Sequence, residues 1–156
     1  MSEDDGDPRP GPMGPKTQEL LDYWNGLRGD REMPSRKEID PVDLRRLLPH
    51  IMITEIEPDT GRFLFRLVGT RVTVMYGNDN TGKYLDEVYF GRHREAITRS
   101  YVTAYETRAP HHCWMKFTNR EGLEFDMERL ILPLSSDGQR VDKLISLLDI
   151  HENQPR

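Results

Sequence analysis

The sequence predicts an α+β domain in which a five-stranded antiparallel sheet carries helices on one face and follows an amphipathic N-terminal helix. Three observations support this prediction. The length of 156 residues suits one ordinary domain. The strand-like segments come in the order two strands, a helical middle and three strands. The turns expected at residues 119–122 and 135–138 carry the Asn, Asp, Ser and Gly residues typical of hairpins.

Residues 1–16 are expected to form a disordered tail. They contain prolines at positions 8, 10, 12 and 15 and almost no apolar side chains. Ordering them would bury too little apolar surface to offset the lost conformational entropy. The segment is acidic rather than basic and then apolar, so it does not read as a secretory signal.

Residues 17–49 are predicted to form a helical extension before the sheet. Thr17 is a suitable N-cap, and Arg28-Gly29 ends the first helix. Asp40 and Pro41 open a second short helix, as N-cap and first helical residue. The apolar face of the first helix must be covered by its own domain or by a second subunit. That face is formed by Leu20, Leu21, Trp24 and Leu27.

Residues 50–151 are predicted to form the sheet and its helices. Alternating or continuous apolar runs predict the strands, and spacing of three to four residues predicts the helices. The expected strands are residues 51–56, 63–68, 111–118, 123–134 and 141–150. The expected helical segments are residues 69–76 and 92–108, with a further short element at 84–88.

Composition narrows the function classes. The formal net charge is −5, which gives the chain no overall attraction to nucleic acid or anionic lipid. The single cysteine, Cys113, excludes an intramolecular disulfide and a cysteine-rich zinc site. No run approaches the ~20 apolar residues that a membrane-spanning helix needs. The expectation is a cytoplasmic protein without nucleic acid or membrane partners.

Several short motifs occur in an order that resembles the PAS domain family. They are Tyr23-Trp24, Met33-Pro34-Ser35-Arg36, Ile39-Asp40-Pro41, Leu47-Leu48-Pro49, Phe65-Arg66-Leu67-Val68-Gly69-Thr70, Gly77-x-Asp79-x-Thr81-Gly82 and Glu128-Arg129-Leu130-Ile131-Leu132-Pro133-Leu134-Ser135 with Asp137-Gly138. Together they cover about residues 18–150 and are most similar to a subgroup of short, often stand-alone bacterial PAS proteins. The resemblance implies a PAS-like sheet, a sensory or protein-interaction role, frequent dimerisation and no fixed ligand.

A PAS domain holds its ligand between sheet and helices, and strand alternation predicts the residues there. Phe125, Met127, Arg129 and Ile131 share one strand face. If that face is the inner one, the guanidinium of Arg129 needs a partner, which is either a bound carboxylate or phosphate or an internal acidic residue. The alternative is that Arg129 lies at the surface. The candidate pocket consists of Phe65, Leu67, Tyr76, Tyr101, Met115, Phe117, Met127 and Arg129, and the same residues suit a plain core.

The opposite face of the sheet is a candidate interface. Alternation from Cys113 places Trp114 on the outer sheet face, which must be covered by the N-terminal helix or by another subunit. Aromatic side chains favour interfaces, so we expect a homodimer. Its candidate contact residues are Leu20, Trp24, Leu27 and Trp114.

The sequence shows no evident cofactor, metal or catalytic group. The resemblance implies that a flavin photoreceptor would carry a cysteine where this chain has Asn80, and a haem sensor a histidine on the long helix. His93 lies near that helix and is expected to be solvated. The row Glu124, Asp126 and Glu128 reads as a solvated face rather than an acid–base pair. No metal-binding, phosphate-loop or nucleophile motif is present.

Three functions are therefore open. The preferred one is a sensory adaptor that binds a small ligand or a signalling protein and relays the signal through dimer and N-terminal helix contacts. The second is a ligand-free interaction or structural module. The third, a small enzyme of similar layout, has no candidate catalytic residues.

Overall fold

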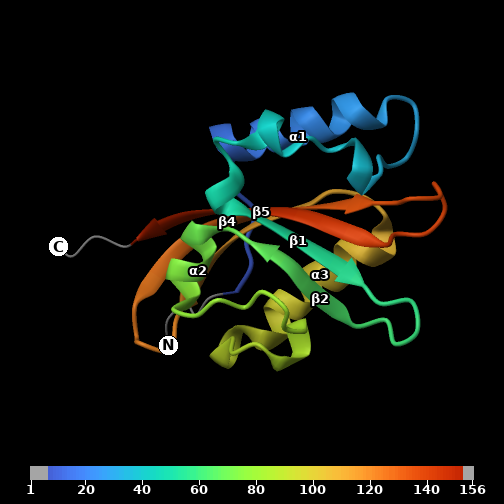
Figure 1. Cartoon of the computed structure of the whole chain (residues 1–156). Coiled ribbons are helices and arrows are strands. Elements are labelled where there is room, and N and C mark those ends of the chain that lie inside the picture. Colours follow the sequence, from blue (N-terminus) through green and yellow to red (C-terminus); the bar gives the residue numbers. More distant parts are fainter. Residues whose placement is uncertain (1–6, 153–156) are drawn as a thin grey trace.

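The computed structural model describes residues 7–152 and contains the predicted five-stranded antiparallel sheet (Figure 1). The strand order is β2-β1-β5-β4-β3. The strands are β1 (Ile51–Ile56), β2 (Phe63–Val68), β3 (His111–Thr118), β4 (Glu124–Leu134) and β5 (Lys143–Glu152). The α-helices are α1 (Pro15–Arg28), α2 (Thr70–Tyr76) and α3 (Arg94–Thr107). Short 3₁₀ turns occupy Arg36–Glu38, Pro41–Leu44, Leu48–His50, Leu85–Glu87 and Gly91–His93.

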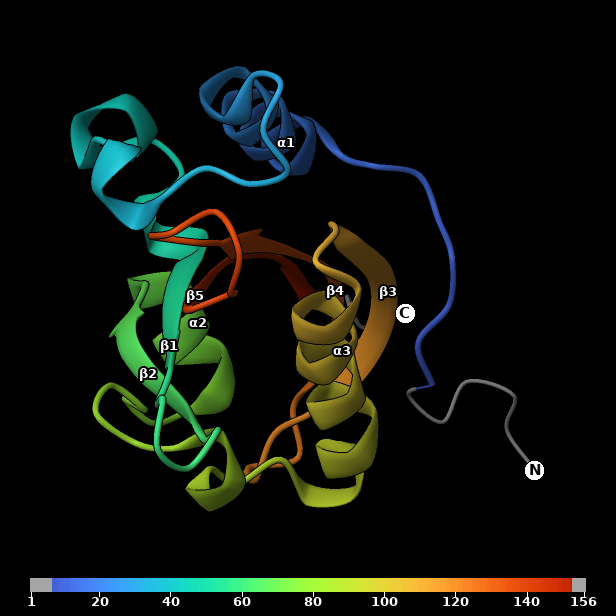
Figure 2. The same ribbon diagram turned by 90° about the vertical axis from the view of Figure 1, so that its right-hand side faces the viewer.

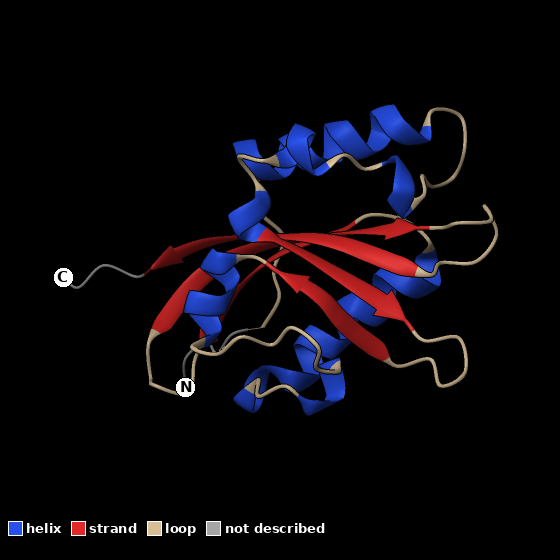
Figure 3. Ribbon diagram, in the orientation of Figure 1, coloured by secondary structure: helices blue, strands red, loops and turns tan. Residues whose placement is uncertain are grey.

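The sheet separates two layers of helix (Figure 3). Helices α2 and α3 cover one face, called the inner face here, and α1 covers the other, called the outer face (Figure 1). Side chains along each strand alternate between these faces. The core is therefore continuous across both faces of the central strands β4 and β5, which is why residues 130–132 of β4 are all buried.

Helix α1 uses the predicted apolar stripe to cover its own sheet. Leu20 and Trp24 are 1% and 3% exposed, and the Trp24 indole Nε1 donates a hydrogen bond to the carbonyl oxygen of Pro133 (2.9 Å). The helix begins at Pro15 with Gly14 as N-cap, so the prediction of Thr17 as N-cap is wrong. Proline suits the first helical turn because its missing N–H would have no partner there.

The prediction of a disordered tail is wrong for residues 7–16, while residues 1–6 lie outside the described part. Arg9 and Trp114 exchange backbone hydrogen bonds of 2.8 Å each, so residues around Arg9 extend the sheet at the free edge of β3. The Arg9 guanidinium pairs with Asp126 (2.9 Å). In Figure 2 the segment runs beside β3 and up to α1. Backbone pairing and one ion pair thus order a segment that carries little apolar surface.

The second predicted helix is replaced by two 3₁₀ turns. Asp40 caps the first as predicted, because its side chain accepts a hydrogen bond from the Val42 N–H (3.0 Å), and Pro41 is its first residue. The first turn ends at Leu44, and Leu48 begins the second, which holds Pro49 near its start, where a missing backbone N–H is tolerated. The bounds of the other predicted elements agree with those in the structure to within two residues.

Candidate functional site

Arg129 is the most unusual residue of the inner face. Its side chain is completely buried and lies beside Tyr101 of α3, so of the two directions left open by the sequence it takes the inward one. Its Nη1 lies 3.4 Å from the sulfur of Met115, a weak acceptor. Its Nε and Nη2 have no hydrogen-bond partner among residues 7–152. The internal acidic partner considered from the sequence is therefore not found within this range.

The surroundings of Arg129 leave its charge uncompensated. Burial acts to lower the pKa of Arg129, but its electrostatic interactions with Tyr76, Tyr101 and Cys113, together with hydrogen bonding to the Tyr76 hydroxyl, outweigh burial and raise that pKa above its ordinary value. Burial raises the pKa of both tyrosine hydroxyls, so they are neutral at pH 7. A buried cation that meets only neutral groups costs several kcal/mol, on the order of ~3–5 kcal/mol for a broken buried pair.

Three further polar atoms of the inner face also have no partner among residues 7–152: Thr54 Oγ1, His111 Nε2 and Ser146 Oγ. The strand register places Ser146 and His111 on either side of Ile131 in one cross-strand row. Burial lowers the pKa of His111, and the charge of Arg129 lowers it further, so this ring is neutral at pH 7. The inner face thus carries unsatisfied hydrogen-bonding groups on β1, β3 and β5 as well as on β4.

The remaining candidate pocket residues, except Leu67, are buried and contact one another. The ring of Phe65 lies edge-on to Tyr101 at 6.0 Å, and Tyr76 lies edge-on to Phe117 at 5.0 Å. The Tyr101 ring is also 5.9 Å from the Arg129 guanidinium carbon. These aromatic side chains form the wall of the candidate site. The structure places Phe65, Tyr76, Tyr101, Met115, Phe117, Met127 and Arg129 in this interior.

Leu67 does not belong to the candidate pocket. It is 38% exposed and pairs with Ile53, whereas Phe65 pairs with Thr54. The register shifts between Ile53 and Thr54, so an extra residue of β2 stands in the ladder. A bulge of this kind reverses the alternation, and Leu67 therefore turns away from the face that Phe65 occupies.

The outer face holds a buried carboxylate that the sequence interpretation missed. Glu128 is completely buried, so the prediction of a solvated acidic row is wrong for this residue. Its Oε2 accepts a hydrogen bond from the Gly14 N–H (3.0 Å) and lies 2.7 Å from His112 Nε2. Its Oε1 has no partner among the described residues. In the strand register Glu128 pairs with Asp149 of β5. The only signal in the sequence was its position next to an inward-facing Arg129.

The candidate interface residues are largely used within the chain. Leu20 and Trp24 are buried between α1 and the sheet, so of the two covers considered from the sequence their own domain supplies the one seen within the chain. Leu27 is partly buried against the same core. The Trp114 indole donates to the Pro12 carbonyl oxygen (2.8 Å) and stacks on His151. The homodimer itself stays a prediction.

A hollow of about 290 Å³ opens beside α2 and the segment that follows it. Tyr76 lines this hollow and is also an electrostatic neighbour of Arg129. Three basic side chains and one acidic side chain lie around it. The lining residues are Tyr76, Asn78, Asn80, Lys83, Glu87, Val88, Tyr89, Arg94 and Arg120.

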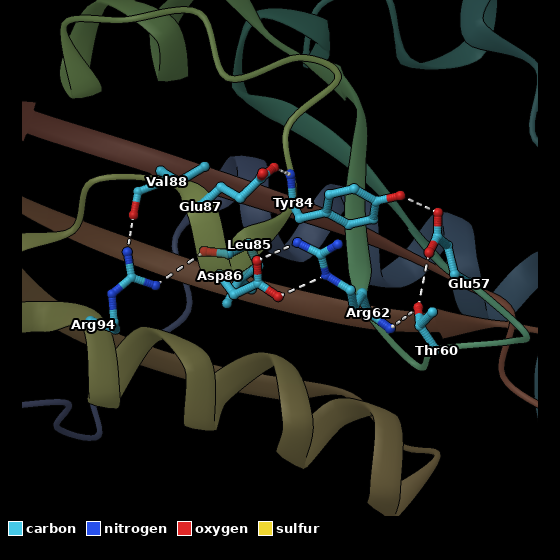
Figure 4. Close-up of polar contacts among 9 residues, drawn as sticks. All are labelled: Glu57, Thr60, Arg62, Tyr84, Leu85, Asp86, Glu87, Val88 and Arg94. Atoms are coloured by element: carbon cyan, nitrogen blue, oxygen red, sulfur yellow. Dashed lines mark hydrogen bonds and ion pairs between the residues drawn. The ribbon is translucent and has the colours of Figure 1, made fainter.

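A polar cluster on the surface, formed by Arg62, Asp86, Tyr84 and Glu57, differs from Arg129 in that its charged groups are paired. Figure 4 shows the Arg62 guanidinium bound through two nitrogens to Asp86, at 2.9 and 2.7 Å, and stacked on the Tyr84 ring at 3.7 Å. The Tyr84 hydroxyl in turn donates to Glu57. Every charged group of this cluster has a partner. The cluster therefore connects the β1–β2 hairpin to the segment around Tyr84 and Asp86, and it leaves no unpaired group to bind a ligand.

His93 is buried, so the prediction of a solvated histidine is wrong. Its Nε2 accepts a hydrogen bond from the Thr118 N–H (3.1 Å), and its ring packs on Phe117. Between residues 7 and 152 no three His, Cys, Asp or Glu side chains come together as metal ligands would. In the same range no helix combines the length and apolarity needed to cross a membrane.

The chain is similar to the solved Rhodobacter sphaeroides LOV protein (10% identity, TM-score 0.52, 72% of this chain and 68% of that one). It is also similar to the LOV domain of the Erythrobacter litoralis EL346 blue-light activated histidine kinase (14%, 0.52, 67% and 96%). A third similar structure is a PAS domain from Colwellia psychrerythraea (13%, 0.52, 74% and 100%). At these identities the likeness shows the fold alone.

No curated protein matches the sequence. The family model described as "PAS domain" matches residues 13–149, which is most of the chain and includes α1, β1 to β4 and the larger part of β5. The chain therefore belongs to the PAS domain family.

Proposed function

We propose that this chain is a sensory module that holds a small molecule on the inner face of its sheet and reports the state of that site to a partner. The observation that supports it is the Arg129 guanidinium, completely buried with two N–H groups unpartnered among residues 7–152. Buried polar groups in native proteins are normally satisfied, and an exception points to a missing ligand or water. The proposal includes no catalytic activity.

The N-terminal segment, residues 9–28, is the proposed relay. Arg129 and Glu128 are consecutive residues of β4 and point to opposite faces of the sheet. Glu128 binds the Gly14 N–H, directly before α1. A displacement of β4 on ligand binding would therefore move a group that anchors the start of α1. The receiver of this signal is a protein partner or a second copy of the chain.

A ligand-free interaction module is the second candidate. It is favoured by the close packing of the interior, where Tyr101 contacts Phe63, Phe65 and the Met52 sulfur. In this case Arg129 would be a structural residue whose charge is compensated by water alone.

Native mass spectrometry of freshly purified protein separates the two candidates. We expect the wild-type protein to carry a stoichiometric small molecule that Arg129→Met loses. Arg66→Met is the matched control, because Arg66 is exposed and pairs with Glu55, and this variant should keep the molecule. A bare wild-type mass, together with unchanged amide exchange in residues 9–28 across a library of metabolites, would support the ligand-free module instead.

A further inference from the structure

The two unpartnered donors of Arg129 have a defined geometry. Nε and Nη2 lie on the same edge of the planar guanidinium, and their hydrogens point in nearly parallel directions. Nη1, at the other end, is the atom next to the Met115 sulfur. An edge with two parallel donors matches the two oxygens of a carboxylate. A neutral ligand oxygen would leave the buried positive charge uncompensated.

We infer that the inner-face site takes a small carboxylate anion, held through both oxygens by Nε and Nη2 of Arg129. This inference rests on the proposed function and adds the chemical class of the ligand. The unpartnered Ser146 Oγ and His111 Nε2, on the strands that flank β4, supply hydrogen-bonding groups for the rest of the molecule. Because Arg129 is enclosed by side chains, the ligand is small.

The hollow beside α2 supplies a second, independent argument. Lys83, Arg94 and Arg120 line it against the single carboxylate of Glu87. Clefts lined mainly by one sign of charge concentrate ligands of the opposite sign. This hollow therefore attracts anions to an opening on the inner-face side of the molecule.

Tyr76 connects the hollow to the buried guanidinium. It lines the hollow, is only 6% exposed, and interacts with Arg129. It lies at the end of α2, directly before Gly77, which has φ of 77° and closes the helix. Rotation of this one side chain at a helix end would admit a ligand from the cationic hollow. Tyr76 is thus the gate of the carboxylate site.

Titration with propionate tests the inference. The probes are propionate, its neutral isostere propionamide and inorganic phosphate, at equal ionic strength set with sodium chloride. The readout is the NMR resonance of the Arg129 Nε–H, assigned by its absence from Arg129→Met. We expect propionate to shift this resonance and to saturate. Arg129→Lys keeps the charge but loses the two-donor edge, so it should bind propionate about tenfold more weakly.

Arg66→Lys is the matched control and should bind propionate as the wild type does, because Arg66 is exposed on β2. Propionamide or phosphate binding more tightly than propionate would overturn the carboxylate assignment and leave the proposed function in place. The carboxylate assignment is also overturned, and the proposed function kept, if no probe shifts the Arg129 resonance while the purified protein carries another molecule. A bare protein that responds to nothing would overturn both proposals.

Discussion

At the scale of single residues, position 69 requires glycine because two backbone segments approach each other closely there. Gly69 is the N-cap of α2 and has an ordinary φ of −65°, so its conformation does not require glycine. A Cβ at this position would lie 2.3 Å from the Pro49 carbonyl oxygen and 2.4 Å from that of Leu48. Backbone atoms cannot yield as a flexible side chain can. The absent side chain therefore lets α2 pack against the turn before β1.

Gly69→Ala is expected to destabilise the protein by about 1–3 kcal/mol, because it overpacks a contact between backbone segments. Gly26→Ala is the matched control: a Cβ at Gly26, within helix α1, meets nothing within 4 Å. It should stabilise the protein by up to ~1 kcal/mol through helix propensity. Urea denaturation of both variants measures the two effects. Equal midpoints would show that the Gly69 contact relaxes without cost.

At the scale of elements, a capping box orders the connector between α1 and the sheet. Glu38 accepts hydrogen bonds from the Arg31 guanidinium and the Ser35 N–H. These interactions, the Arg31 hydrogen bond first, lower the pKa of Glu38 from its ordinary value to about 2. The carboxylate thus joins both ends of the turn that follows α1.

The pKa of Glu38 predicts a defined pH dependence. A group whose pKa is lower in the folded state stabilises the protein above its unfolded pKa, and this stabilisation is lost as pH falls through the folded value. Glu38→Gln should therefore be less stable than the wild type at pH 7. The difference should shrink from about pH 4.5 towards pH 2.

Urea midpoints of wild type and Glu38→Gln at several pH values check this dependence. Glu95→Gln is the control, because the Glu95–Arg99 pair is largely exposed and such pairs contribute little. A constant difference between wild type and Glu38→Gln at all pH values would contradict the role of the ionised carboxylate.

At the scale of the whole molecule, residues 9–28 complete the outer face. They cover Glu128 through Gly14, cover Trp114 through Pro12, and bury Leu20 and Trp24 on the sheet. The sheet residues below are largely apolar. Those buried on this face include Ile51, Leu130, Leu132, Ile145 and Leu147.

Removal of residues 1–28 is expected to expose this apolar face and to cause self-association. Removal of residues 1–6 alone is the control, since it leaves the contacts of Arg9 and Gly14 in place. Light scattering coupled to size-exclusion chromatography measures both. A shortened chain that keeps the mass distribution of the control at high concentration would contradict a covering role for the segment.

From the amino-acid sequence alone came the five strands, their order along the chain, the strand face that Arg129 shares with Met127 and Ile131, and the apolar stripe of α1. These follow from periodicity, which is a local property. The aromatic wall followed in the same way: helical spacing placed Tyr101 and strand alternation placed Phe117.

The burial of Glu128, the ordered conformation of residues 7–14 and the outward direction of Leu67 depend on contacts between segments distant in sequence. Glu128 is covered by a segment more than a hundred residues away in the sequence. That segment is rich in Pro and Gly and has no hydrophobic periodicity that would predict its position. Leu67 turned outward because a bulge arises from the pairing of two strands, not from either strand alone. The same holds for Arg129: alternation gave the residues that share its face, but only the packed interior showed that this face is the inner one and that Arg129 has no acidic partner among residues 7–152.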